Sequence, residues 1–269
     1  MRLVAAALAA AAVGLSCVAY STAATSAQPP LVAVLDTGID AAHPDLAGKV
    51  TAARDFVDAT GNTTDASWHG TAVAGVIAAA DPGSLLLSAK VLDAQDAGTD
   101  AEIARGLVWA VAAGARVVNL SMAGPTEAPV LRTAIRNAVA QGVVVVAAAG
   151  NDGTSARSYP AADPNVIGVA ATTGSDTLFS WSNHGSWVAL AAPGQVTTTL
   201  RGGGLTTFVG TSAAAPAVAA AAAECLAVAP TLSPAAVRRL LTSTAAPVAG
   251  EPFGRLDVGH AVQACAVSA

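Results

Sequence analysis

Short apolar runs alternate with longer stretches of mixed character from residue 31 onward. Five of the runs are rich in Val, Leu and Ala and predict β-strands, at residues 31–35, 84–92, 116–120, 143–149 and 165–171. Three longer stretches predict helices, at residues 69–80, 101–114 and 128–141. Strands that are apolar throughout and separated by helices indicate a mostly parallel sheet with helices on both faces. We therefore expect an α/β protein whose functional side chains lie at the carboxyl ends of the strands.

The first 27 residues follow a different pattern. Arg2 precedes an uncharged apolar run, and the small-residue stretches TAA and TSA then end at Ala24 and Ala27. This order predicts a secretory signal peptide over residues 1–27, cleaved near residue 24 or 27. An uncleaved anchor, or a lipid on Cys17, is the alternative. Residues 28–269 contain no linker or repeat and are expected to form one domain.

The composition narrows the class of protein. Hydrophobic residues make up 53% of the chain and charged residues 12%, but Ala supplies much of the apolar character, so we expect no membrane span in the mature chain. Loss of Arg2 with the signal leaves an excess of acidic residues and no basic cluster, which argues against a nucleic-acid partner. Cys225 and Cys265 also remain. Two cysteines in an exported chain are expected to pair, and two buried thiols are the alternative.

Three residues with catalytic chemistry stand at the boundaries of predicted elements. Asp36 follows the first strand in VAVLDTGID, His69 begins a helix in SWHGTAVAG, and Ser212 begins an alanine-rich helix in VGTSAAAPAVA. Each residue alone is usually structural. Together, the motifs DTGI, HGTAVAG and GTSAAAP, in the order Asp, His, Ser, resemble the subtilisin-like serine proteases, or subtilases. The resemblance extends from Leu31 to about Gly259.

The resemblance implies a three-layer subtilisin-like fold and a secreted serine endopeptidase that cleaves extended protein segments through an acyl-enzyme intermediate. A hydroxyl is a poor nucleophile, so His69 would accept the proton of Ser212, and Asp36 would orient the imidazole. The Ser212 backbone N–H and the side chain of Asn151, in AAAGNDG, would stabilise the oxyanion. Pro216 lacks the N–H that would bond the Ser212 carbonyl, so the first helical turn can stay open.

The same resemblance implies a cleft in which an extended peptide lies between two strand-like segments. One segment would be Ser121, Met122 and Ala123, the other Ala97, Gly98 and Thr99, and the first specificity pocket would be formed by Ala148, Ala149 and Gly150 with Ser158 near its floor. The peptide bond before Pro160 is expected to be cis. Asp100 and Asp152 make the cleft more acidic than is usual, which predicts that basic or polar side chains are tolerated.

Three features depart from the family pattern. Ala213 stands where the residue after the nucleophile is usually Met, so we expect resistance to peroxide. The helix that starts at His69 runs almost directly into the next strand, which leaves no room for the usual tight calcium loop. We expect no required cofactor, with a weak structural calcium, for example at Asp45, as the alternative. No pro-domain is recognisable between the signal and the first strand.

Two other functions fit parts of the sequence. A catalytically silent module would hold peptide in the same cleft, but such a module typically loses one of the four site residues, and all four are present. A serine esterase of the α/β-hydrolase type would need a Gly-x-Ser-x-Gly motif and the order Ser, acid, His, which GTSAA and the observed order do not provide. We expect polypeptide substrates, a monomer, and an extracellular or cell-envelope location.

Overall fold

The computed structural model describes residues 29–58 and 60–268, so the expected signal peptide lies outside the described residues. The five predicted strands and three predicted helices are confirmed, with ends that differ from the prediction by no more than two residues. They are β1 (Leu31–Asp36), β3 (Leu85–Lys90), β4 (Ala115–Leu120), β5 (Val144–Ala148), β6 (Val166–Thr172), α1 (His69–Ala80), α2 (Asp100–Ala112) and α3 (Pro129–Ala140).

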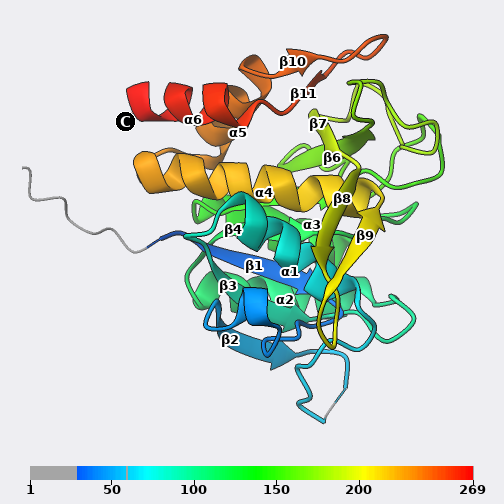
Figure 1. The fold of residues 1–269 in the computed structure, drawn as a ribbon, viewed down its shortest axis with the longest axis vertical. Helices are drawn as coiled ribbons and strands as arrows, with labels where there is room; N and C mark the ends of the chain where they lie inside the picture. The colour runs from blue at the N-terminus through cyan, green and yellow to red at the C-terminus, as the bar shows by residue number, and fades with distance from the viewer. Residues whose placement is uncertain (1–28, 59, 269) are drawn as a thin grey trace, which may run out of the picture.

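The central sheet has nine strands in the order β10-β11-β7-β6-β5-β4-β1-β3-β2 (Figure 1). All neighbouring strands are parallel except the short pair β10 (Ala246–Pro247) and β11 (Gly254–Arg255) at one edge. Strand β2 (Val50–Asp55) forms the other edge, and β7 (Leu190–Pro193) lies beside β6. Most side chains of β2 are exposed, so this strand lacks the continuous apolar run of a buried strand.

Side chains alternate between the two faces of the sheet and fill one large core on each face, and a smaller third cluster surrounds Val248 and Phe253. Val32 and Val34 of β1 face a core that they share with α1 and the long helix α4 (Thr211–Val228). Residues of η1 (Pro44–Leu46), α5 (Pro234–Ser243) and α6 (Val258–Val267) complete this core. Ala33 and Leu35 face the opposite core, which is shared with α2 and α3. The strands thus have helices on both faces, and the expected three-layer α/β architecture is confirmed.

Helix α4 runs through the interior of the domain (Figure 1). It is long and apolar enough to cross a membrane by length and composition, but 72% of its 18 residues are buried inside the fold. Its alanines are short enough for α1 and the strands to pack closely around it. The predicted disulfide is present between Cys225 of α4 and Cys265 of α6, whose Cα atoms are 5.4 Å apart.

A two-stranded hairpin, β8 (Gln195–Thr199) and β9 (Leu205–Val209), leads the chain into α4. It is tied to α1 because the hydroxyls of Thr198 and Thr199 donate to the carbonyl oxygens of Ala72 and Thr71, at 2.8 and 2.7 Å. The ring of Phe208 is buried. The hairpin therefore fixes the start of α4 relative to the start of α1.

Candidate active site

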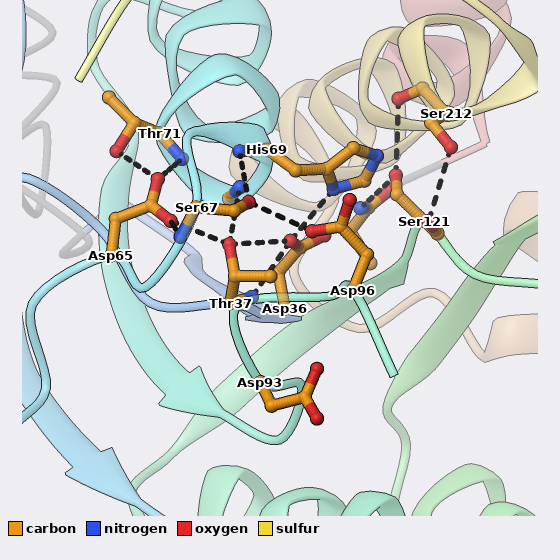
Figure 2. Close-up of polar contacts among 12 residues, drawn as sticks. Asp36, Thr37, Asp65, Ser67, His69, Thr71, Asp93, Asp96, Ser121 and Ser212 are labelled. Atoms are coloured by element: carbon orange, nitrogen blue, oxygen red, sulfur yellow. Dashed lines mark hydrogen bonds and ion pairs between the residues drawn. The ribbon is translucent and has the colours of Figure 1, made fainter. Parts of the chain in front are cut away.

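The candidate site lies where four neighbouring strands end and two helices begin. Asp36 is the last residue of β1, and segments that follow β3, β4 and β5 surround it, since these strands are adjacent in the sheet. His69 is the first residue of α1, and Ser212 is the second residue of α4. These two helices pack against each other on the same face. The topology therefore gathers residues that are far apart in the sequence (Figure 2).

The carboxylate of Asp36 orients the imidazole of His69. Its Oδ1 atom lies 2.8 Å from His69 Nδ1 and also accepts the backbone N–H of Thr37 at 2.8 Å. The Asp36 side chain is fully buried, whereas that of His69 is 14% exposed. A carboxylate on Nδ1 places the Nδ1 proton between the two groups, so Nε2 of neutral His69 is a proton acceptor.

A second buried carboxylate fixes the backbone around His69. Asp65 Oδ1 accepts the hydroxyl of Thr37 at 2.7 Å, and Oδ2 accepts the backbone N–H of Thr71 at 2.8 Å. The Thr37 hydroxyl in turn accepts the backbone N–H of Gly70 at 3.0 Å. A Cβ at Gly70 would lie 2.1 Å from the carbonyl oxygen of Gly38, so only glycine lets α1 approach the end of β1 this closely. These contacts hold the imidazole within reach of Asp36.

Ser212 and Ser121 form a reciprocal pair. The Ser212 hydroxyl donates to the carbonyl oxygen of Ser121 at 3.1 Å, and the Ser121 hydroxyl donates to the carbonyl oxygen of Ser212 at 3.1 Å (Figure 2). The second bond is available because Pro216, inside the helix, has no N–H to give the Ser212 carbonyl. The imidazole of His69 lies on the same side of the site, and in this arrangement the Ser212 hydroxyl bonds to Ser121 rather than to it.

The side chain of Asn151 lies beside the start of α4, and its amide oxygen is already hydrogen-bonded. That oxygen accepts the backbone N–H and the hydroxyl of Thr211, both at 2.9 Å. Because the oxygen faces Thr211, the Nδ2 group is left as a donor. A Cβ built on Gly210, whose φ is +144°, would lie 3.4 Å from Asn151 Nδ2 and 3.6 Å from Ser212 N. The two nitrogen donors thus lie close together at the start of α4, where an oxyanion site would need them.

A cavity of about 480 Å³ lies among the residues that were expected to form the cleft. The lining includes five of the residues expected there: Ala97, Gly98, Thr99, Met122 and Ala123. Ser121 is buried, and its side chain is bonded to the Ser212 carbonyl as described above. Asp100 also lines the cavity, whereas Asp152 does not.

The residues expected around the first specificity pocket are held by Asn183. Its Nδ2 group donates to the Ala149 carbonyl at 3.0 Å, and its Oδ1 atom accepts the backbone N–H of Asp152 at 3.0 Å. Ala148 and Ala149 are buried, as is Gly150. Ser158 is also buried and donates to the Gly124 carbonyl at 3.4 Å. The expected cis bond is present between Tyr159 and Pro160.

Several residues that support the site did not stand out in the sequence. Asp65, Thr37 and Thr71 position His69, and Thr211 and Asn183 position Asn151 and the pocket wall. Asp65 precedes His69 by four residues, and this short separation is the one feature of the sequence that could have linked Asp65 to the site. For Asn183, residue type and local pattern give no signal, because its partners come from a distant segment.

The remaining histidines have structural contacts. His43 is buried, with Nε2 placed 2.9 Å from the Gly204 carbonyl oxygen. His184 Nδ1 lies 3.4 Å from the carbonyl oxygen of Ser182, and His260 pairs with Asp257 at 2.8 Å on the surface. None of these contacts involves Asp36 or Ser212.

The residues near the end of α1 do not fit a calcium loop. Helix α1 ends at Ala80, and a short turn leads directly to Leu85, as the sequence predicted. Asp45 has a side chain that is 63% exposed, and its Oδ2 atom lies 4.0 Å from His43 Nδ1. Within residues 29–58 and 60–268, no three His, Cys, Asp or Glu side chains gather as metal ligands.

The fold and the site together define a class of protein. The family model described as the subtilase family matches residues 28–260, so the chain belongs to this family and is a subtilisin-like serine endopeptidase by homology. Subtilisin from Bacillus pumilus is 42% identical over 229 residues, which are 80% of this chain and 82% of that protein. Thermitase from Thermoactinomyces vulgaris is 37% identical over 247 residues, 86% of this chain and 88% of that protein.

Other relatives are longer than the matched region. Subtilisin E from Bacillus subtilis (strain 168) is 42% identical over 80% of this chain, but the match spans 60% of that protein's length. Among solved structures, that of a cold adapted subtilisin-like serine proteinase has a TM-score of 0.78 and 33% identity, and the match covers 84% of this chain and 86% of that one. The expected subtilisin-like fold is therefore confirmed.

Proposed function

We propose that this chain hydrolyses peptide bonds in extended polypeptide segments through an acyl-enzyme formed on Ser212. The observation that carries the proposal is the 2.8 Å contact between Asp36 and His69, fixed by burial beside the start of α4. This contact makes His69 Nε2 a proton acceptor next to a serine at a helix N-terminus. The nearby pair of N–H donors, from Asn151 and Ser212, supplies the second requirement of acyl transfer.

The proposed reaction has two halves. The Ser212 hydroxyl turns from Ser121 to His69, loses its proton to Nε2, and bonds to the substrate carbonyl carbon. The resulting oxyanion accepts hydrogen bonds from Ser212 N and Asn151 Nδ2. His69 then gives its proton to the departing amine as the peptide C–N bond breaks. Water attacks the acyl group by the same route in reverse, and Ser212 regains its proton.

Binding of the substrate is proposed to use main-chain hydrogen bonds. A peptide that lies between residues 97–99 and 121–123 would add a strand to each segment, which recognises an extended backbone with little dependence on sequence. The first side chain would enter the pocket beside Ala148, Ala149 and Gly150. We propose that Ser158 lies near its floor, which gives a mostly apolar pocket of small residues.

Export and metal independence are also proposed. The N-terminal pattern of residues 1–27 and the Cys225–Cys265 disulfide both suit an oxidising location outside the cytoplasm.

A side-chain cation, rather than a metal ion, is available to bind the loop after Pro160. The Arg238 guanidinium donates to the carbonyl oxygens of Pro164 and Val166 at 2.7 and 3.1 Å. We propose that the protein is active as a monomer without a bound cofactor.

A fluorophosphonate probe followed by a casein assay tests the proposal. We expect the wild-type protein to be labelled on Ser212 and to degrade casein, and Ser212→Ala to do neither. Labelling of Ser212 without degradation of casein would contradict the endopeptidase and favour an esterase. The silent binding module predicts peptide binding with no labelling.

Replacement of Asn151 by Ala should lower kcat by about 10²–10³-fold with little change in KM, since its Nδ2 group would meet the oxyanion only as it forms. This magnitude is the one known for such a donor in subtilisin, a relative of this chain. Steady-state hydrolysis of a peptide nitroanilide measures both constants. The matched control is Asn137→Ala on the exposed surface of α3. An Asn151→Ala effect confined to KM would contradict the assigned role.

The pH dependence of activity should follow His69. Burial lowers the pKa of the imidazole, but the charge and hydrogen bond of Asp36 raise it by more, so that the pKa rises from the ordinary 6.5 to about 9. The general base must be neutral, so kcat/KM should increase with pH, with a midpoint between 6.5 and about 9. A midpoint below 6.5 would contradict this reading.

The same ion pair has the opposite effect on stability. A raised pKa in the folded state means that the pair stabilises the fold fully below pH 6.5 and loses this contribution as the pH rises through the folded-state pKa. Activity and this part of the stability should therefore change in opposite directions. Denaturant midpoints measured across the same pH series, with the Asp36→Asn variant as reference, isolate the contribution.

Peroxide should leave most of the activity intact. The residue after Ser212 is Ala213, and Met122 is the one methionine among residues 29–268. Oxidation of Met122, which lines the cleft, should alter KM more than kcat, because its thioether is not beside the nucleophile. Activity measured after peroxide treatment tests this, with Met122→Leu as the control. Rapid inactivation of both proteins would refute the prediction.

A further inference from the structure

The cavity between residues 96–100 and 122–126 has an unbalanced charge. Two carboxylates, Asp96 and Asp100, are among its lining residues, and no Lys, Arg or His lines it. An aspartate pair in a cavity that lacks any cationic group makes the local potential negative. In the proposed function this cavity holds substrate residues upstream of the cleaved bond, and the inference below depends on that assignment.

Asp96 is the carboxylate closer to the reacting centre. Its Oδ1 atom accepts the hydroxyl of Ser67 at 2.8 Å, and the same hydroxyl oxygen accepts the backbone N–H of His69 at 3.2 Å (Figure 2). Asp96 adopts φ +59°, a left-handed conformation that Asp and Asn tolerate better than most residues. Its side chain is exposed. The loop thus presents a charged group to solvent beside His69 and keeps it there through Ser67.

The other acidic residues of this loop are used to cap the backbone. Asp93 Oδ1 accepts the backbone N–H groups of Gln95 and Ala97, at 2.8 and 3.0 Å. Glu102 Oε2 accepts the backbone N–H of Thr99 at 2.7 Å and completes a capping box. Asp100 has no part in that box and is only half-buried, at the edge of the cavity. The carboxylates of Asp96 and Asp100, by contrast, cap no backbone N–H group of the loop, and the one side-chain hydrogen bond of Asp96 within the described residues is to the Ser67 hydroxyl.

We propose that Asp96 is a specificity-determining residue that favours Lys or Arg at the substrate position immediately before the residue in the first pocket. That position lies beside His69, because the residue in the first pocket carries the carbonyl that Ser212 attacks. A long cationic side chain there reaches the Asp96 carboxylate, whereas an acidic side chain is repelled. Asp100 likewise favours a cationic side chain, at a substrate residue further from the cleaved bond.

The test compares tetrapeptide nitroanilides Ala-Ala-X-Leu, with X as Lys, Ala or Glu. Because exposed ion pairs are weak, we expect kcat/KM for Lys to exceed that for Glu by about three- to tenfold in the wild-type protein. Asp96→Asn keeps an acceptor for Ser67 and tolerates the same φ, so the loop should stay in place while the ratio falls to near one. Sodium chloride at about 1 M should shrink the wild-type ratio as well, since the Debye length is then about 3 Å.

Matched controls separate a local effect from a general one. Asp45→Asn removes an equal charge from an exposed site outside the cavity and should leave the ratio unchanged. Asp100→Asn should leave the ratio at X unchanged and alter selectivity at a substrate position further from the cleaved bond. Casein fragments identified by mass spectrometry give the same comparison on a protein substrate.

Each result bears on the proposal. A wild-type Lys-to-Glu ratio at or below one, or a ratio that persists in Asp96→Asn, would overturn it while leaving the proposed endopeptidase activity in place. Absence of any cleavage, of casein as well as of the peptides, would overturn the proposed function and this inference together. A ratio that falls equally in Asp45→Asn would show a general effect of net charge and would also overturn it.

Discussion

Replacement of Ser212 by Ala should reduce kcat/KM by about 10⁶-fold, because the nucleophile itself is removed. The hydroxyl has one hydrogen bond in the structure, to the carbonyl of Ser121, so its loss should leave the fold unchanged. Hydrolysis of a peptide nitroanilide measures the rate, and circular dichroism checks the fold. A residual rate above that in water is expected from the N–H donors of Asn151 and Ser212, which remain.

A double variant makes this prediction sharper. Ser212 and His69 are proposed to act as one unit, so Ser212→Ala combined with His69→Ala should be scarcely slower than Ser212→Ala alone. Independent roles would instead multiply the two losses. If the double variant loses rate by the product of the single effects, the two residues do not share a proton transfer. The Asn137→Ala variant again serves as a folded, active reference.

Replacement of Asp36 by Asn should lower kcat by about 10⁴-fold. The amide is almost the same size as the carboxylate, so the packing around β1 should be retained, although an NH₂ group turned toward His69 no longer accepts the N–H of Thr37. An amide that donates to His69 Nδ1 would leave the proton on Nε2, which then fails to accept from Ser212. The variant should also show His69 titrating at lower pH, because the charge that raises its pKa is gone.

The control for this variant is Asp45→Asn, a carboxylate-to-amide change at an exposed position, for which we expect wild-type kcat. Single-turnover kinetics with an active ester isolates the acylation step. A loss of less than tenfold in Asp36→Asn would mean that the imidazole is oriented by other groups. In that case the Asp65 network, rather than the Asp36 contact, would hold His69.

The buried elements of the fold could be predicted from the sequence because their side-chain pattern is simple. Strands such as β1 and β5 lie between two helical layers, so they are apolar at every position except Asp36, the last residue of β1. Edge strand β2 and the hairpin β8–β9 were not predicted. Many of their side chains are exposed, and the buried Thr198 and Thr199 of β8 are polar, so no continuous apolar run marks them.

The same difference separates the parts of the site that could and could not be predicted. Asp36, His69 and Ser212 lie in three short motifs whose order along the chain carried the prediction. Asn183 and Asp96 lie outside those motifs, and their contacts join segments that are distant in the sequence. A side chain that acts through a distant partner leaves no local pattern, so the coordinates were needed to find it.

The reciprocal hydrogen bonds between Ser121 and Ser212 have a consequence for the enzyme without bound substrate. A peptide that adds as a strand to residues 121–123 brings N–H groups to the very carbonyl that holds the Ser212 hydroxyl. Competition for that acceptor would release the hydroxyl when a scissile bond has arrived in front of it. Without bound substrate, the Ser212 hydroxyl would remain hydrogen-bonded to the Ser121 carbonyl rather than to the imidazole of His69.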